Sequence, residues 1–495
     1  MAAAVVVATS CLEKYPASAI QTQKAMNTYD DALQFNTGIY ALLKSSSLYT
    51  GYLTLLPDIQ ADLVYAVDGY SNQMGSFWLW QLRSTTGESE SVYAALYNVI
   101  SNCNFFLENI DKVKNNTVDD KKLSDLDYFT GEAYAIRALA YSELLKLYCK
   151  AYNPDTAKKE LGVVIRRYYS ASEAATRASL YDSYQFVLED LKRAEELLDE
   201  EQNIYGQIYT TKAMAEALHA RVALYMQNWE DAVEYSTRLI ESKSFALSSV
   251  NNTVSTQNHF QYLWTNDDGY EILWRIYLTP ESYGGMLGSM FLGFNNDRTY
   301  YYPDYVPAQW VLNLYDSSDL RANAYFATAQ TGYAHQLVWP LLIKYRGNES
   351  FINSYYLYEV SMPKPFRLAE QYLIRAEAYC RQQQYSKASA DLTELRAARY
   401  QSGKGTMTVN ATNWLENIAN ERVRELYMEG HRLHDMKRWG KEYNEGKGFE
   451  RTPQTNSLEE GSYLKKRADD YMFVWPIPRH EVEAPGSRVQ QNEGY

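Results

Sequence analysis

The chain has 495 residues, with 48 Lys and Arg against 61 Asp and Glu, which gives a net charge of −13 at pH 7. This acidic excess argues against a nucleic-acid ligand, because proteins hold polyanions with clustered basic side chains. The length allows a large buried core, and the most unusual feature of the composition is its 46 tyrosines. We therefore expect much aromatic area to lie at the surface.

Residues 1–10 form a short segment of apolar and small residues that ends at Cys11. The run AAAVVVA has the length of a minimal signal-peptide core, and the small residues before Cys11 suit a lipoprotein signal peptidase. No Lys or Arg precedes the cysteine, although signal peptides normally begin with positive charge, so a buried first helix is the competing interpretation. No apolar run after Cys11 is long enough to span a bilayer as a helix.

Two stretches, residues 215–241 and 368–399, each indicate a pair of helices joined by a short polar turn. Apolar and small residues recur there every three or four positions, which predicts one buried face per helix. In both stretches one alanine lies twelve residues before another, Ala220 before Ala232 and Ala376 before Ala388. This spacing is typical of tetratricopeptide-like helix pairs, in which small side chains of antiparallel helices meet. An ordinary pair of antiparallel helices is the alternative.

Residues 243–365 differ in character, because Gly, Asn, Asp and Tyr accumulate and short β-type runs such as 271–278 appear. We expect a mostly α fold with a tetratricopeptide-like helix-pair scaffold and an inserted loop-rich layer that contains short strands. Residues 11–495 would form a single domain, with helical parts over 28–242 and 366–495. A loop-rich layer on a helical scaffold is a common position for a functional site.

Four separated motifs in the C-terminal half carry a resemblance to a known family. They are PFRLAEQYLIRAEAYCRQQQYSKASADLTELRAAR, ERVRELYMEGHRLHDMKRWG, FVWPIPRHEVEA and the terminal QNEGY. In this order they closely resemble the SusD/RagB family of Bacteroidetes surface lipoproteins. In the N-terminal half, GEAYAIRALAYSELLKLY and the D-x-R sequence that ends at Arg321 are similar to further family segments. The resemblance runs from Cys11 to Tyr495, with local departures at Gln382–Gln384 and at Glu493.

The resemblance implies a surface-exposed protein of the cell outer membrane, anchored only by lipid on Cys11. It also implies docking on a SusC-like TonB-dependent transporter, over which the protein acts as a lid that captures a glycan. The family is non-catalytic, so no enzymatic activity is expected. We also expect no cofactor, and the sequence assigns no residue to a metal site and leaves open whether the loop layer binds a metal. Capture of peptides or of another nutrient by the same mechanism is an alternative, since members that resemble RagB serve that class.

Sugar ligands favour exposed aromatic rings surrounded by polar side chains, because sugars have flat C–H faces ringed by hydroxyls. Two segments, residues 66–83 and 282–305, supply both kinds of residue. The candidate ligand contacts are Asp68, Tyr70, Asn72, Trp78, Trp80 and Arg83 in the first segment, and Asn295, Tyr300 and Tyr301 in the second. In an extended chain Trp78 and Trp80 would share one face. The alternative is that both tryptophans, and the second segment's tyrosines, pack against the scaffold.

Other chemistry has weaker support in the sequence. His431 and His434 lie three residues apart on an expected helix, but they fall within a scaffold motif of the family, so we do not expect a metal site. No G-x-S-x-G, Walker A or H-E-x-x-H motif is present. A helical-repeat interaction scaffold and a glycoside hydrolase are the remaining functional alternatives, and nothing in the sequence selects a catalytic carboxylate pair.

Overall fold

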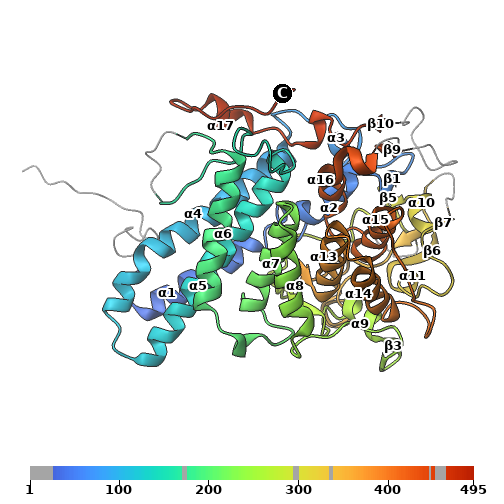
Figure 1. The fold of residues 1–495 in the computed structure, drawn as a ribbon, viewed down its shortest axis with the longest axis horizontal. Coiled ribbons are helices and arrows are strands. Elements are labelled where there is room, and N and C mark those ends of the chain that lie inside the picture. Colours follow the sequence, from blue (N-terminus) through green and yellow to red (C-terminus); the bar gives the residue numbers. More distant parts are fainter. Residues whose placement is uncertain (1–25, 170–174, 294–299, 334–337, 445–447, 452–463) are drawn as a thin grey trace, which may run out of the picture.

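The computed structural model describes residues 26–169, 175–293, 300–333, 338–444, 448–451 and 464–495, and it is mostly helical (Figure 1). Cys11 lies outside the described residues. Among the described residues, no helix combines the length and the apolar character that crossing a bilayer requires.

Consecutive antiparallel helices form most of the N-terminal half. They are α1 (Tyr29–Leu43), α2 (Tyr52–Gln60), α3 (Gly75–Trp78), α4 (Gly87–Asn115), α5 (Asp120–Tyr148), α6 (Leu180–Leu197), the 3-10 turn η2 (Glu200–Gln202), α7 (Lys212–Tyr225) and α8 (Trp229–Glu241). Helices α4 to α8 follow one another across Figure 1, and each packs against the next. The array then continues through contact of α8 with α13 (Leu368–Arg381).

The C-terminal half completes this array. Its remaining helices are α14 (Tyr385–Ala397), α15 (Trp414–Leu426), α16 (Arg432–Asn444), the 3-10 turn η4 (Tyr471–Phe473) and α17 (Arg479–Glu483). Ala220 and Ala232 lie fully buried with Ile374 and Ala378 in one small apolar cluster where α7, α8 and α13 meet. The small side chains allow this close approach, and the predicted mostly helical scaffold of helix pairs is confirmed.

The middle of the chain contains short helices and short strands. The helices are α9 (His259–Thr265), α10 (Gln309–Leu312), α11 (Ala322–Tyr325) and α12 (Glu349–Tyr355). The strands of the whole described chain are β1 (Val64–Ala66), β2 (Thr253–Val254), β3 (Gln257–Asn258), β4 (Ile272–Trp274), β5 (Tyr305–Pro307), β6 (Phe326–Gln330), β7 (Val338–Leu342), β8 (Phe366–Arg367), β9 (Phe449–Arg451) and β10 (Leu464–Lys466). They pair antiparallel in twos: β1 with β5, β2 with β3, β4 with β8, β6 with β7 and β9 with β10.

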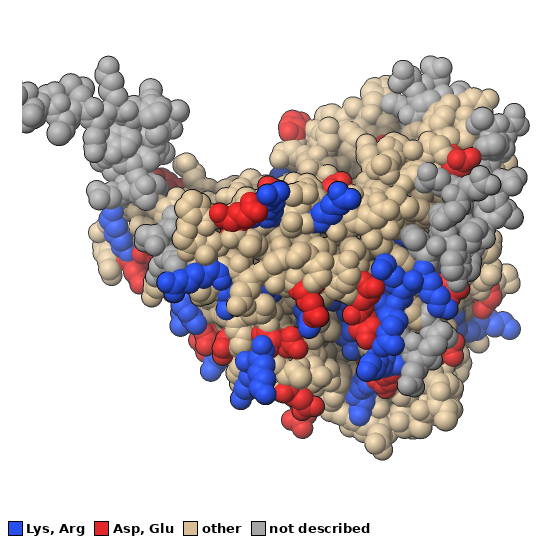
Figure 2. All heavy atoms as spheres, turned by 90° about the horizontal axis from the view of Figure 1, so that it is seen from above, with Lys and Arg blue, Asp and Glu red and all other residues tan. Residues whose placement is uncertain are grey.

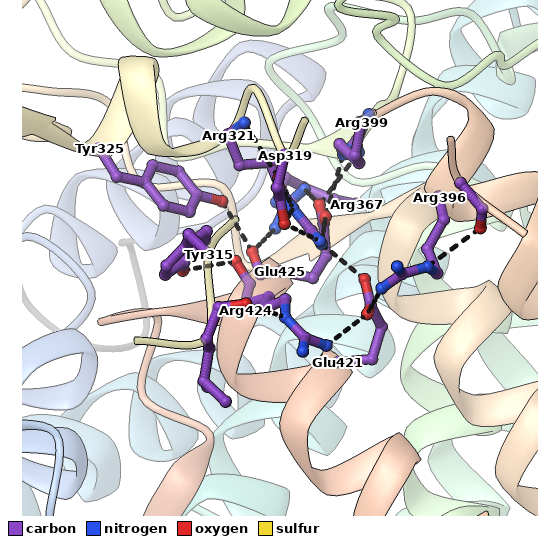
Figure 3. A network of polar contacts seen from close by, with 12 residues as sticks. Tyr315, Asp319, Arg321, Tyr325, Arg367, Arg396, Arg399, Glu421, Arg424 and Glu425 are labelled. Carbon is purple, nitrogen blue, oxygen red and sulfur yellow. Dashed lines mark hydrogen bonds and ion pairs between the residues drawn. The ribbon is translucent and has the colours of Figure 1, made fainter. Parts of the chain in front are cut away.

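A buried network of arginines and carboxylates joins this middle region to the helical array (Figure 3). Arg321 binds Asp319 through Nη2 at 2.6 Å and Glu421 of α15 through Nη1 at 2.7 Å. Arg399 reaches Glu425 of the same helix at 2.9 Å. Burial alone would raise the pKa of Glu421, but Arg321 and two further arginines lower it to about 2. The D-x-R sequence and the family motif on α15 are therefore the two sides of one structural ion-pair cluster.

The loop before α16 is fixed to α2 by a second set of polar contacts. Both oxygens of Asp58 accept backbone N–H bonds at 2.9 Å, one from Gly430 and one from Arg432. The Arg432 guanidinium also donates to both oxygens of Asp62 at 2.9 Å. His431 and His434 are buried in this region, and no group of three potential metal ligands occurs within the described ranges. Their burial makes both histidines part of the packed scaffold.

Candidate ligand-binding surface

The two tyrosine-rich segments singled out in the sequence meet in the structure. Strand β1 pairs with β5 in the register Val64 to Pro307 and Ala66 to Tyr305, so the chain after β1 lies beside the chain before β5. The backbone N–H of Val67 donates to the carbonyl oxygen of Asp304 at 2.9 Å and extends the pairing beyond the strands. We call residues 67–73, 300–304 and 331–333 together the aromatic loop surface.

Three tyrosine rings line this surface with different exposure. Tyr300 and Tyr302 are 44% and 40% exposed, whereas Tyr301 is half-buried and accepts a backbone hydrogen bond from Gly332. The ring of Tyr302 lies edge-on to Tyr333 with 5.5 Å between centroids. A Cβ at position 332 would overlap the Tyr302 ring, so the glycine permits this close packing. Tyr300 and Tyr302 therefore present aromatic area to solvent, and Tyr301 is mainly a packing residue.

Tyr333 supports this arrangement from a third segment. Its hydroxyl donates to the carbonyl oxygen of Pro303 at 2.8 Å. Burial, with a smaller effect from Asp304, raises the pKa of Tyr333 to about 12, so the hydroxyl keeps its proton and acts as a donor. Sequence reasoning missed Tyr333, and it also omitted Tyr302 from the candidate contacts although the run of three tyrosines was recognised.

Polar groups of the two loops surround the rings. Asp304 accepts the backbone N–H and the hydroxyl of Ser71, both at 2.7 Å, which holds the first loop against the second. The Tyr70 ring is half-buried, and its hydroxyl donates to Oδ1 of Asn72 at 2.9 Å. Asp68 is exposed at the turn that follows β1. Carboxylate, amide and hydroxyl groups of the first loop thus belong to the same surface as the exposed tyrosines, and contact of Asp68, Tyr70 and Asn72 with a ligand stays a prediction.

The first loop has an unusual backbone. Asn72, Met74 and Trp80 have φ values of 63°, 55° and 54°, which is the left-handed region. Such conformations cost roughly 1–3 kcal/mol for a residue with a side chain and concentrate at binding sites. The cost is offset by the packing of the loop's apolar residues, and the result is a defined shape for the polar residues above them.

Trp78 and Trp80 do not form the predicted exposed pair. Trp78 and Trp80 are 0% and 3% exposed, because Trp78 ends the short helix α3 and the left-handed conformation of Trp80 turns the chain again. The Arg451 guanidinium packs over both rings, at 5.0 and 4.6 Å from their centroids, and Nε1 of Trp80 donates to the carbonyl of Gln60 at 2.6 Å. Both tryptophans are core residues under the loop and cannot stack on a ligand while the loop is folded.

Two further predicted contacts, Arg83 and Asn295, are not among the residues that form the described surface. Arg83 is exposed in the turn before α4, and within the described part of the chain no contact joins its side chain to the aromatic loop surface. Asn295 lies outside the described residues. On the face shown in Figure 2, acidic and basic side chains are interspersed and broad areas carry neither, so that face offers no continuous basic track for a polyanion.

Comparisons with known proteins agree with this mostly helical architecture. A family model described as the SusD family matches residues 323–495, and one described as "Starch-binding associating with outer membrane" matches residues 13–224. The chain belongs to the SusD/RagB family. The prediction from the sequence motifs is thereby confirmed.

Individual relatives have low sequence identity to this chain, and some of them match it over nearly its whole length. SusD-like protein P2 of Formosa agariphila is 23% identical over 99% of this chain and 97% of its own length. The starch-binding protein SusD of Bacteroides thetaiotaomicron is 34% identical over 26% of this chain and 21% of its own. A crystal structure of a putative sugar binding protein from Bacteroides vulgatus covers 95% of this chain and 99% of its own, with a TM-score of 0.76 and 24% identity. At this identity the structural likeness establishes the fold.

Proposed function

We propose that this protein binds an oligosaccharide or polysaccharide on the aromatic loop surface. The observation that carries the proposal is the β1–β5 pairing, with the contacts of Val67 and Ser71 to Asp304, which brings the loop of Asp68 and Asn72 beside the end of the segment 300–304. Tyr300 and Tyr302 of that segment are exposed. Aromatic rings stack on the C–H faces of sugars, and the polar groups bind hydroxyls. The names of the starch-binding and sugar-binding relatives support this ligand class.

We infer binding without turnover. A glycosidase needs two carboxyl groups about 5–10 Å apart, one of them free to give a proton. Asp304, the carboxylate between the two loops, is 7% exposed and both of its oxygens accept hydrogen bonds from Ser71. Asp304 therefore holds the two loops together and is not free to give a proton to a ligand. The starch-binding relative is likewise named for binding.

The family supports a role in uptake for the bound glycan. We infer that lipid on Cys11 holds the protein at the outer surface of the outer membrane, and that it docks on a SusC-like TonB-dependent transporter and delivers the glycan to it. The family model that covers residues 13–224 is described as associating with the outer membrane, which supports this location. A shallow aromatic surface leaves much of the ligand in water, so affinities of roughly 4–8 kcal/mol, about millimolar to micromolar, suit a protein that must release its cargo.

Peptide capture is the second candidate. The net charge of −13 would steer cationic peptides to the surface, and such steering weakens as salt is added. The affinity of a glycan that stacks on tyrosines depends little on the salt concentration. The effect of ionic strength on binding therefore separates the two ligand classes.

A titration of the full chain against a panel of soluble polysaccharides, followed by calorimetry, tests the proposed function. We expect saturable binding of one glycan class that weakens at least tenfold in Tyr302→Ala and in Tyr300→Ala. Tyr355→Ala is the matched control, because this tyrosine is 56% exposed on α12, outside the aromatic loop surface. Absence of binding to every polysaccharide of the panel, or an equal loss of affinity in Tyr355→Ala, would contradict the proposal.

A further inference from the structure

A second cavity, which shares no residue with the aromatic loop surface, lies between α1, the segment before α7 and the end of β4. It has a volume of about 140 Å³. Its lining residues are Thr37, Tyr40, Ala41, Leu43, Lys44, Ile208, Tyr209, Trp274, Arg275, Ile276 and Tyr277. We call it the Tyr277 cavity. In Figure 1, α1 lies at the left of the molecule whereas β1 and β5 lie at the right, so the cavity belongs to a different part of the surface.

Aromatic rings form the mouth and one wall of the Tyr277 cavity. Tyr209 and Tyr277 are each 40% exposed, so both offer ring area to a ligand. Tyr209 lies edge-on to Tyr40 with 5.0 Å between centroids. The Tyr40 hydroxyl donates to Glu132 at 2.8 Å and accepts the backbone N–H of Thr210 at 2.8 Å, which fixes this wall. A fixed aromatic wall binds a flat ring without further ordering of side chains.

The polar groups of the cavity are donors and cations. Lys44 and Arg275 line it, and none of its lining residues is Asp or Glu. Within the described residues Lys44 forms no ion pair; its Nζ reaches only the Ser282 hydroxyl, at 3.4 Å. Arg275 is already engaged: its guanidinium donates to the carbonyl oxygens of Asp267 and Gly206, and its Nη1 forms a long ion pair of 3.9 Å with the half-exposed carboxylate of Asp268.

The charges of the lining residues determine which kind of ligand the cavity favours. The lining contains two cations and no carboxylate, and Lys44 has no ion-pair partner among the described residues, so the cavity favours an anionic ligand over a neutral one.

The size admits one sugar ring, so a longer oligosaccharide would place only its terminal ring in the cavity. A cavity of about 150 Å³ holds a benzene molecule, whereas drug-sized ligands occupy about 300–1,000 Å³. We propose that the Tyr277 cavity is a second saccharide site, which binds a single pyranose ring carrying a carboxylate or a sulfate ester. The ring stacks on Tyr277 or Tyr209, and its anionic group pairs with Lys44 and Arg275.

Two anionic probes and one neutral probe test this site on the full chain. The probes are trigalacturonate, galactose 6-sulfate and the uncharged trisaccharide of galactose, titrated by calorimetry at low salt. We expect at least one anionic probe to bind, and its identity distinguishes carboxylate from sulfate. Its affinity should fall at least tenfold in Tyr277→Ala and in Lys44→Gln and should decrease with added salt, and the neutral trisaccharide should not bind at this cavity.

Matched variants separate this proposal from the first site. Tyr302→Ala and Tyr355→Ala should leave the anionic probe's affinity within twofold of the original. Loss of affinity in Tyr302→Ala but not in Tyr277→Ala would place the probe on the aromatic loop surface and overturn the second site. Absence of binding by both anionic probes, or equal binding of the neutral trisaccharide at the cavity, would also overturn it. Tyr277 is exposed and Lys44 makes one long hydrogen bond, so thermal melts of both variants should match the original chain.

Discussion

Replacement of Arg321 by Met tests whether the buried ion-pair cluster holds the middle of the chain to the helical array. Arg321 is fully buried and pairs with Asp319 at 2.6 Å, Glu421 at 2.7 Å and Glu425 at 3.1 Å. Both glutamates keep other arginines as partners, but Asp319 has no other cation in an ion pair within the described residues. The substitution therefore leaves one buried carboxylate uncompensated, which costs about 3–5 kcal/mol.

Urea unfolding followed by tryptophan fluorescence measures this cost. The double variant Asp319→Asn with Arg321→Met should recover part of the loss, because it removes the uncompensated charge as well as its partner. Arg467→Met is the matched control, since that arginine pairs with Asp469 on the surface and its replacement should leave the free energy of unfolding almost unchanged. A loss of under 1 kcal/mol for Arg321→Met, or a double variant that is less stable than the single one, would refute the reasoning.

Three further predictions address the core, the pH dependence and the anchor. Trp78→Ala should destabilise the fold by about 3–5 kcal/mol, because this ring is fully buried; a fully stable variant that had lost glycan binding would show instead that the ring contacts ligand. Burial raises the pKa of Glu132 to about 8, against hydrogen bonds from Asn36 and Tyr40. The folded state thus keeps a proton that the unfolded chain has released, and stability contributed by this group is lost as the pH rises from about 4.5 to 8. Unfolding measured at pH 5 and pH 8 should show Glu132→Gln gaining stability relative to the original at the higher pH, whereas a constant difference would contradict a protonated Glu132. Cys11→Ser should move the protein from the membrane fraction to the soluble fraction in cell fractionation, and retention in membranes would argue against the lipid anchor.

The helical scaffold was predictable because its signals are local. Ala220 and Ala232 lie on neighbouring helices joined by a short turn, so their spacing in the sequence is enough to predict that they meet. The turns themselves are equivalent in the two helix pairs, with Gln227 at φ 61° and Gln383 at φ 62°. This left-handed position explains the glycine that the family often has where this chain has Gln382–Gln384.

The details of the site were less predictable because they depend on distant contacts. The pair of Trp78 and Trp80 was assigned to the surface from its spacing in an extended chain, but α3 and a left-handed residue turn the backbone there. Arg451, which covers both rings, lies far along the chain, so no local sequence pattern predicts this contact. Tyr333 was missed for the same reason, since only tertiary packing brings it to Tyr302.

The most direct test of glycan binding on the aromatic loop surface is a fluorine NMR titration of the full chain with 3-fluorotyrosine placed at position 302 alone. The account predicts a saturable change in the Tyr302 resonance when the bound glycan class is added, and no change in a second sample labelled only at Tyr355. Binding of the glycan, measured by calorimetry in the same solution, with an unmoved Tyr302 resonance would contradict the central claim.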